Sequence, residues 1–234
     1  MSDLGSSRKP VTASELVERL GNDPRFIARR DEADSRRQQV VEQNARAAAP
    51  VVLDLQAAGL SFGSIGEMRR SGTRYVVAIP VLLKWLPAVE NHDVKESIVR
   101  ALSVPWARPV AAAPLIAEFR KAPGPESGLK WAIGNALSVV ADDSVFDDLA
   151  ALVRDRRHGK AREMLAVAIG NMRDPRAVDL AIELLGDDEV AGHALMAIGK
   201  LGARKARPVV EPFLNHPKAW IRAKARRVLA RLDR

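Results

Sequence analysis

The chain has 234 residues, of which 47% are hydrophobic, 28% charged and only 4% aromatic, and it contains no cysteine. This proportion of apolar residues suffices for one or two domains with a buried core and excludes a disordered chain. The absence of cysteine excludes disulfides and any cysteine-based metal site or nucleophile. The formal charge is +8, but residues 200–234 carry 11 Lys and Arg side chains against two acidic ones, whereas residues 1–199 carry 26 against 27.

Residues 1–72 carry no repeat and are predicted to form a helical extension. Residues 12–20 fit a short helix, because Thr12 and Glu15 have the spacing of a capping box. Residues 24–49 fit one long or broken helix whose charges alternate in sign, a pattern typical of a solvated face. We expect this extension to cover the apolar side of the helices that follow.

Three further segments lead into the rest of the chain. Residues 50–58 fit a short helix of their own, after which several glycines divide the chain into turns. Residues 55–74 resemble a helix-turn-helix in outline, but glycines in the supposed recognition helix favour a simple linker. An apolar helix with Pro80 is expected at residues 73–86, where a repeat domain covering residues 73–234 begins.

One short apolar phrase then recurs, at intervals of 35, 36, 29 and 31 residues. This period fits one pair of helices per repeat, with the phrase closing the first helix and its Ala or Gly residues letting neighbouring helices approach. The phrases begin at Ile98, Ile133, Ile169, Ile198 and Leu229. The second helices are expected at residues 111–121, 145–154, 176–185 and 208–214. The last repeat is expected to stop after its first helix, and helix N-caps are expected at Asp93, Ser144 and Asp174.

Residues 162–178 contain the most complete copy of the repeat. The pair Leu184-Leu185 and the acidic turn Asp187-Asp188 come after it in the chain. This stretch resembles the HEAT-like repeats named after phycobilisome lyases, and the resemblance covers about residues 73–234. It implies an all-α fold, a right-handed, armadillo-like α-solenoid of about four to five helix pairs with a helical N-terminal extension. HEAT-like repeats serve as protein-binding scaffolds, enzyme and lyase subunits and DNA-glycosylase frameworks, so the resemblance does not select a function.

No sequence motif typical of an enzyme is present. None of the four histidines lies three or four residues from another, and neither a nucleophile elbow, a phosphate loop nor a dinucleotide fingerprint occurs. We therefore expect no catalytic residue, metal or cofactor. No apolar run approaches the roughly 20 residues of a membrane span, and no apolar signal core follows the N-terminus, so a soluble cytoplasmic protein without membrane contact is expected.

Two surfaces remain as candidates for binding. The third residue of each phrase is polar, and a stacked array would place these residues in one row along its edge. They are Arg100, Asn135, Asn171, Lys200 and Arg231. Basic side chains also cluster at residues 154–162 and on the expected last helix, whose excess of positive charge goes beyond what a polar end cap needs.

Two tryptophans are expected to differ in exposure. Trp106 lies between two prolines outside the expected helices, where an indole could anchor a partner. Trp131 falls in an apolar helix two residues before Ile133 and is expected in the core. The candidate partner-binding residues are Arg100, Trp106, Arg108, Arg154, Arg156, Arg157, Lys200, Arg222, Lys224, Arg227 and Arg231.

The sequence thus favours a non-catalytic scaffold that holds a partner protein, with an acidic surface, on its concave helical face and docks it on a basic C-terminal patch. The alternatives are nucleic-acid binding through the basic C-terminal repeats, or an immunity-type inhibitor that wraps an acidic toxin. A continuous positive face would favour nucleic acid, whereas a positive end beside a face of mixed charge would favour protein.

Overall fold

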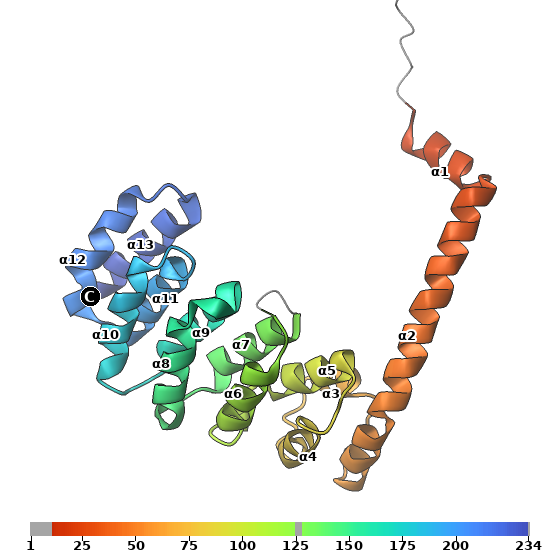
Figure 1. The fold of residues 1–234 in the computed structure, drawn as a ribbon, viewed down its shortest axis with the longest axis horizontal. Helices are drawn as coiled ribbons and strands as arrows, with labels where there is room; N and C mark the ends of the chain where they lie inside the picture. The colour runs from red at the N-terminus through yellow and green to blue at the C-terminus, as the bar shows by residue number, and fades with distance from the viewer. Residues whose placement is uncertain (1–10, 125–127, 234) are drawn as a thin grey trace, which may run out of the picture. The chain divides into compact units, whose positions relative to one another are not determined.

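The computed structural model describes residues 11–124 and 128–233. These residues form thirteen α-helices joined by turns and short 3-10 segments, and they contain no β-strand (Figure 1). The chain divides into two compact units, Met1–Arg46 and Ala47–Arg234, which are described separately. No helix in the described part of the chain combines the length and apolar character needed to cross a membrane.

The first unit contains α1 (Ala13–Gly21) and most of α2 (Pro24–Ala57). The predicted capping box is confirmed, since the Thr12 N–H donates to Glu15 Oε2 (2.9 Å) and the Glu15 N–H donates to Thr12 Oγ1 (3.3 Å). Most side chains of α2 in this unit are exposed, and ion pairs between neighbouring turns, such as Glu32 with Arg36, replace a core. The alternating charges therefore form the solvated face that the sequence predicted.

The break predicted at Pro50 is wrong, because α2 continues through this proline to Ala57. Proline has no N–H to donate to the carbonyl four residues earlier, that of Arg46, where the two compact units divide. The helix continues because Val51 and Leu55, one turn apart, are both buried in the core of the second unit. Tertiary packing thus offsets the missing hydrogen bond.

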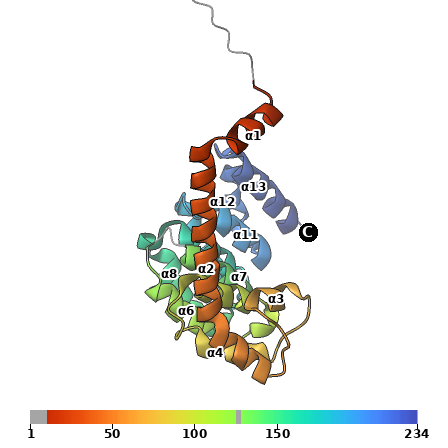
Figure 2. The same ribbon diagram turned by 90° about the vertical axis from the view of Figure 1, so that its right-hand side faces the viewer.

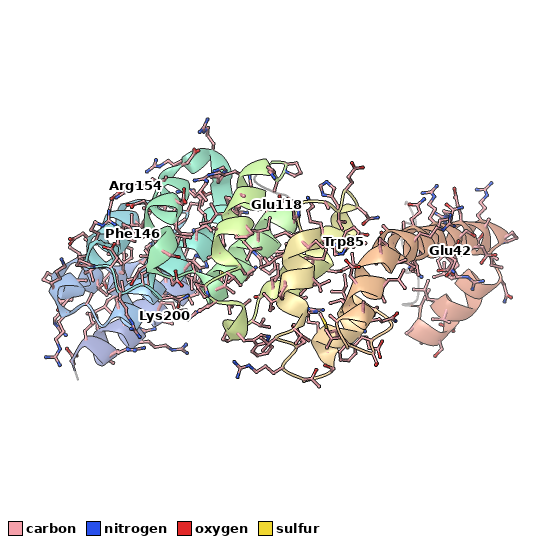
Figure 3. The ribbon with its side chains drawn as sticks, turned by 90° about the horizontal axis from the view of Figure 1, so that it is seen from below. Glu42, Trp85, Glu118, Phe146, Arg154 and Lys200 are labelled. Atoms are coloured by element: carbon pink, nitrogen blue, oxygen red, sulfur yellow. The ribbon has the colours of Figure 1, made fainter. Side chains whose placement is uncertain are left out.

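The second unit begins with the end of α2, followed by α3 (Ile65–Arg70) and α4 (Ala78–Trp85). Ser64 caps α3 by accepting a hydrogen bond from the Glu67 N–H, and Met68 of α3 is fully buried. Trp85 is labelled in Figure 3. Its indole N–H and the Lys84 ammonium both donate to Asp54 Oδ2 at 2.7 Å and join α4 to α2. Residues 47–72 therefore share one hydrophobic core with the repeats.

The repeats form two rows of helices. Within each row the helices follow one another along the unit in chain order (Figure 1). The phrase row consists of the helices that carry the repeated phrase, and each packs on the next one in this row. Its members are α5 (His92–Leu102), α7 (Gly128–Val140), α9 (Arg162–Ile169), α11 (Ala191–Leu201) and α13 (Ala219–Leu232). The flanking row consists of α4, α6 (Ala112–Lys121), α8 (Phe146–Arg154), α10 (Arg176–Glu183) and α12 (Arg207–Val210).

The order of the helices within a repeat differs from the expected one. Among the flanking helices, each phrase helix packs most on the one that precedes it, so that the pairs are α4–α5, α6–α7, α8–α9, α10–α11 and α12–α13. The final phrase helix therefore completes the last pair and does not begin an unfinished one. The chain positions predicted for α6, α8 and α10 are nevertheless confirmed to within a few residues.

Small residues in the phrase allow adjacent phrase helices to lie close together. A Cβ at Gly170 of the phrase in α9 would lie 2.9 Å from the Ala197 Cα of α11, and one at Gly199 would lie 3.1 Å from a methyl group of Val228 in α13. The isoleucines before these glycines, Ile169 and Ile198, are fully buried. Figure 2 also shows α11 and α13 side by side.

Two of the expected N-caps are wrong by two residues. Asn91, not Asp93, caps α5 by accepting from the Val94 N–H (3.0 Å), and Asp142, not Ser144, accepts from the Ser144 N–H (3.0 Å) ahead of α8. In both turns the polar side chain nearer the preceding helix reaches the free amides first, because the next residues already belong to the helical turn. Asp174 does accept a hydrogen bond from the Arg176 N–H at the start of α10 (2.8 Å).

Replacing Gly170 by alanine should lower the free energy of unfolding by about 1–3 kcal/mol, since the new Cβ would meet the backbone of α11. Urea denaturation followed by circular dichroism measures this loss. Gly186→Ala is the matched control, because a Cβ there meets nothing within 4 Å. Equal unfolding midpoints for the two variants would contradict the close packing of α9 on α11.

Candidate functional site

The flanking row presents charged side chains that pair across neighbouring elements. Arg154 of α8 donates through Nε and Nη2 to both carboxylate oxygens of Glu183 in α10, at 2.8 and 2.6 Å. The other pairs of this face are Arg120 with Asp148, Arg176 with Asp147, and Lys205 with Asp179. The partners lie 26–29 residues apart in the chain, which is close to one repeat. The face is therefore of mixed charge, with its ions paired internally.

A shallow groove of about 400 Å³ separates α8 from α10 on this face. Its floor includes the buried Ala150 and Leu180, and the Arg176 guanidinium lies over the Phe146 ring, 4.3 Å from the centroid. Phe146 and Arg154 both project from α8 (Figure 3). Ion pairs at both ends leave a small apolar strip between charged walls.

The basic cluster at residues 154–162 contributes little free charge. Arg157 pairs with Asp155 (2.7 Å) and Arg156 with Asp187 (3.4 Å), and Arg154 is bound to Glu183. These three candidate residues are therefore placed together, but each is partly neutralised by a carboxylate. Sequence reasoning missed these partners, although opposite charges spaced by about one repeat were a usable signal.

Arg162 in the same cluster is the largest fully buried side chain, with 1% of its surface exposed. Its Nη1 donates to Asp187 Oδ2 (2.7 Å) and to the Val153 carbonyl (3.2 Å), its Nε donates to the Gly159 carbonyl, and its Nη2 pairs with Glu189. Burial acts to raise the pKa of Asp187, but the hydrogen bonds it accepts from Arg162 and from the Glu189 N–H hold that pKa below its usual value. Arg162 thus joins the end of α8 to the turn before α11.

The third phrase residues lie at three places: Asn171 with Lys200, Arg100 with Asn135, and Arg231 on α13. Asn171 donates to the Ser138 carbonyl at the end of α7 (2.6 Å), and Lys200 donates to Asn171 Oδ1 (3.0 Å). Arg108 donates to the neighbouring Val139 carbonyl (2.7 Å). Burial, and to a lesser degree the charge of Arg108, lower the pKa of Lys200. Arg108 and Lys200 therefore satisfy the C-terminal carbonyls of α7, directly or through Asn171.

Arg100 and Trp106 meet in a second cavity, the α5–α7 pocket, which has a volume of about 340 Å³ and is also lined by Asn135. Trp106 is half-buried and packs edge-on against the buried Tyr75, with ring centroids 5.5 Å apart. Trp131, expected in the core, is 47% exposed. A residue two positions from a buried one points to the opposite side of a helix, and Ile133 is the buried member of the two.

Helix α13 carries cations without internal partners. Lys224, Arg227 and Arg231, here called the α13 basic face, are spaced by three and four residues and therefore lie on one side of the helix. Within residues 11–124 and 128–233, none of the three forms an ion pair or a hydrogen bond through its side chain. Arg222, in contrast, donates to the His216 and Pro217 carbonyls (both 2.8 Å) and orders the turn before α13.

In the described part of the chain, no three His, Asp or Glu side chains are placed to share a metal ion. The chain matches no protein-family model, no curated protein and no solved structure.

Arg162→Leu should lower the free energy of unfolding by about 3–5 kcal/mol, because it removes the nearer and buried cation of the partly buried Asp187 and leaves only the exposed Arg156 at 3.4 Å. Arg157→Leu is the matched control in the same turn, since its side chain is 89% exposed, and its midpoint should stay close to that of the wild type. Urea denaturation measures both. A wild-type midpoint for Arg162→Leu would show that the network does not hold the repeats together.

Asp187 should also make stability depend on pH. Because its pKa is depressed in the folded state, its contribution is complete above the unfolded pKa of about 3.9 and disappears as the pH falls through the folded pKa. Asp187→Asn should therefore flatten the acid limb of a plot of unfolding free energy against pH below about pH 5. Asp188→Asn, the adjacent exposed acid, is the control. An unchanged acid limb in Asp187→Asn would contradict the assignment.

Proposed function

We propose that the second unit is a HEAT-like α-solenoid that acts as a non-catalytic scaffold for an acidic protein partner, docked on the α13 basic face. Consecutive packing of the phrase helices at the repeat interval supports the solenoid. The flanking row, with the apolar floor of the groove between α8 and α10, would hold the body of the partner. The likeness to HEAT-like repeats thus remains part of the proposal.

The main support for docking on α13 is a difference in how the basic side chains are paired. Cations of the flanking row are bound to carboxylates of the neighbouring repeat, whereas those of the α13 basic face are unpaired among the described residues. Like charges three and four residues apart on a helix repel each other, and an acidic partner would remove this cost. Charge complementarity of this kind accelerates association and selects the partner more than it adds affinity.

The same contrast favours protein over nucleic acid. A nucleic acid needs a track of cations for its phosphates, but the unpaired cations of α13 occupy one helix of 14 residues. Beside it, the flanking row presents the carboxylates of Asp147, Asp179 and Glu183, each already sharing a cation. A polyanion would gain little net attraction from this internally neutralised face, while a polypeptide of mixed charge could exchange ion pairs with it.

The triple variant Lys224→Glu, Arg227→Glu, Arg231→Glu should lose the partner. The intact chain is used to recover the partner after nuclease treatment, and the purified partner is then titrated with each variant by calorimetry. The triple variant should bind at least about tenfold more weakly. Arg222 is left unchanged because it bonds the turn before α13.

A matched control reverses three exposed cations on other elements, Arg25, Lys160 and Arg173, and should bind as the wild type does. Equal loss in both triple variants would show a general charge effect and contradict docking on α13. A parallel recovery without nuclease that enriches nucleic acid in place of protein would establish the alternative function, with an affinity that falls against salt at a log–log slope of about 0.9 per neutralised phosphate.

A further inference from the structure

The α5–α7 pocket is lined by basic and neutral groups. Its volume of about 340 Å³ lies at the lower end of the range of roughly 300–1,000 Å³ for small-molecule sites. Arg69 of α3 and Arg100 of α5 line it, together with Thr73, Ser103 and Asn135, and none of its lining residues is acidic. The cavity therefore offers many hydrogen-bond donors and two fixed positive charges, without a carboxylate of its own.

Its two arginines differ in how far they are already neutralised. Arg100 pairs with Glu96 of the same helix at 2.6 Å, and both side chains remain partly exposed, at 40% and 30%. Arg69 forms no ion pair and donates no side-chain hydrogen bond within the described residues. Its charge nevertheless reaches the pocket, because it opposes the rise in the pKa of Tyr75 that burial causes. A net positive charge therefore remains at the cavity.

Trp106 forms a rigid wall of this pocket. The centroid of its indole ring lies 5.5 Å from that of the Tyr75 ring, in a T-shaped arrangement, and 5.9 Å from the Arg74 guanidinium carbon. Tyr75 is fixed in turn, since its hydroxyl donates to the Ala101 carbonyl (3.1 Å). The indole N–H of Trp106 is buried and has no acceptor among the described residues, which is costly for a polar group shielded from water.

We propose that the α5–α7 pocket binds a small oxyanion, a phosphate or a carboxylate, between the Arg69 and Arg100 guanidiniums and against Trp106. The planar fork of a guanidinium matches two oxygens of either group. The size of the cavity admits a single anionic group with a short substituent and excludes a folded chain. The site lies at α3, α5 and α7 and uses no residue of α13, so it is separate from the proposed docking patch and goes beyond the scaffold function.

The test follows the Trp106 indole N–H signal by two-dimensional NMR, assigned with Trp106→Phe, during titration with inorganic phosphate, acetate or chloride at constant ionic strength. Phosphate or acetate should shift the signal saturably, and chloride should not. Arg69→Gln should weaken binding at least about tenfold, as expected for a charged hydrogen bond. Arg69 is exposed, so this change leaves the core intact.

Arg70→Gln is the matched control, because Arg70 is the next exposed arginine of α3 and does not line the cavity. It should bind within about twofold of the wild type, since only a screened charge is lost. Saturation by phosphate or by acetate identifies which oxyanion the site prefers. A shift that never saturates, one that chloride reproduces, or equal affinity of Arg69→Gln and the wild type would each overturn the proposal.

Discussion

Close contact between successive phrase helices is the constraint on which the rest of the structure depends. Where Gly170 faces α11 and Gly199 faces α13, a side chain of even one carbon would approach atoms of the next helix to about 3 Å or less. This contact fixes the distance between repeats, and thereby the distance between flanking helices. The ion pairs of the flanking row form because that distance matches the reach of an arginine or lysine and a carboxylate on the adjacent repeat.

Stacking therefore decides which charges are available to a partner. A side chain in the middle of the array has a neighbour on each side, and Arg154 or Arg176 finds its carboxylate there. Within the described residues α13 has a neighbour in the phrase row on one side only, α11. Its outward cations stay without carboxylates for this geometric reason. Position in the array thus decides whether a basic side chain is neutralised by a neighbouring carboxylate. The number of basic residues in each segment does not by itself tell where the net charge of +8 is exposed.

Much of the helical organisation could be predicted from the sequence, because apolar periodicity and capping chemistry are local. The capping box at Thr12 and the positions of α6, α8 and α10 follow from such signals. Features that depend on neighbours could not be predicted in the same way. Pro50 stays helical because residues beyond it are buried, and Arg154 is neutralised by an acid 29 residues away.

The candidate site was predictable to a similar degree. Arg100 and Trp106 were selected for separate reasons, one for its place in the phrase and the other for its flanking prolines, and the fold brings them to one cavity. Arg69 was not among the selected residues, because only the tertiary fold places α3 beside α5. Trp131 shows that apolar neighbours in the sequence do not by themselves predict burial. The angle around the helix between Trp131 and the buried Ile133 also has to be considered.

The charged outer side of α13 also bears on how copies of this chain meet. Its inward side buries Ile221, Val228 and Leu229 against the preceding helices, whereas Trp220 near its start stays 45% exposed. If another copy continued the row there, it would have to place its own helix over Lys224, Arg227 and Arg231 and remove them from water without a counter-charge. Electrostatic repulsion between two such ends adds to this cost. The charge on α13 therefore opposes continuation of the phrase row by a second copy of the chain.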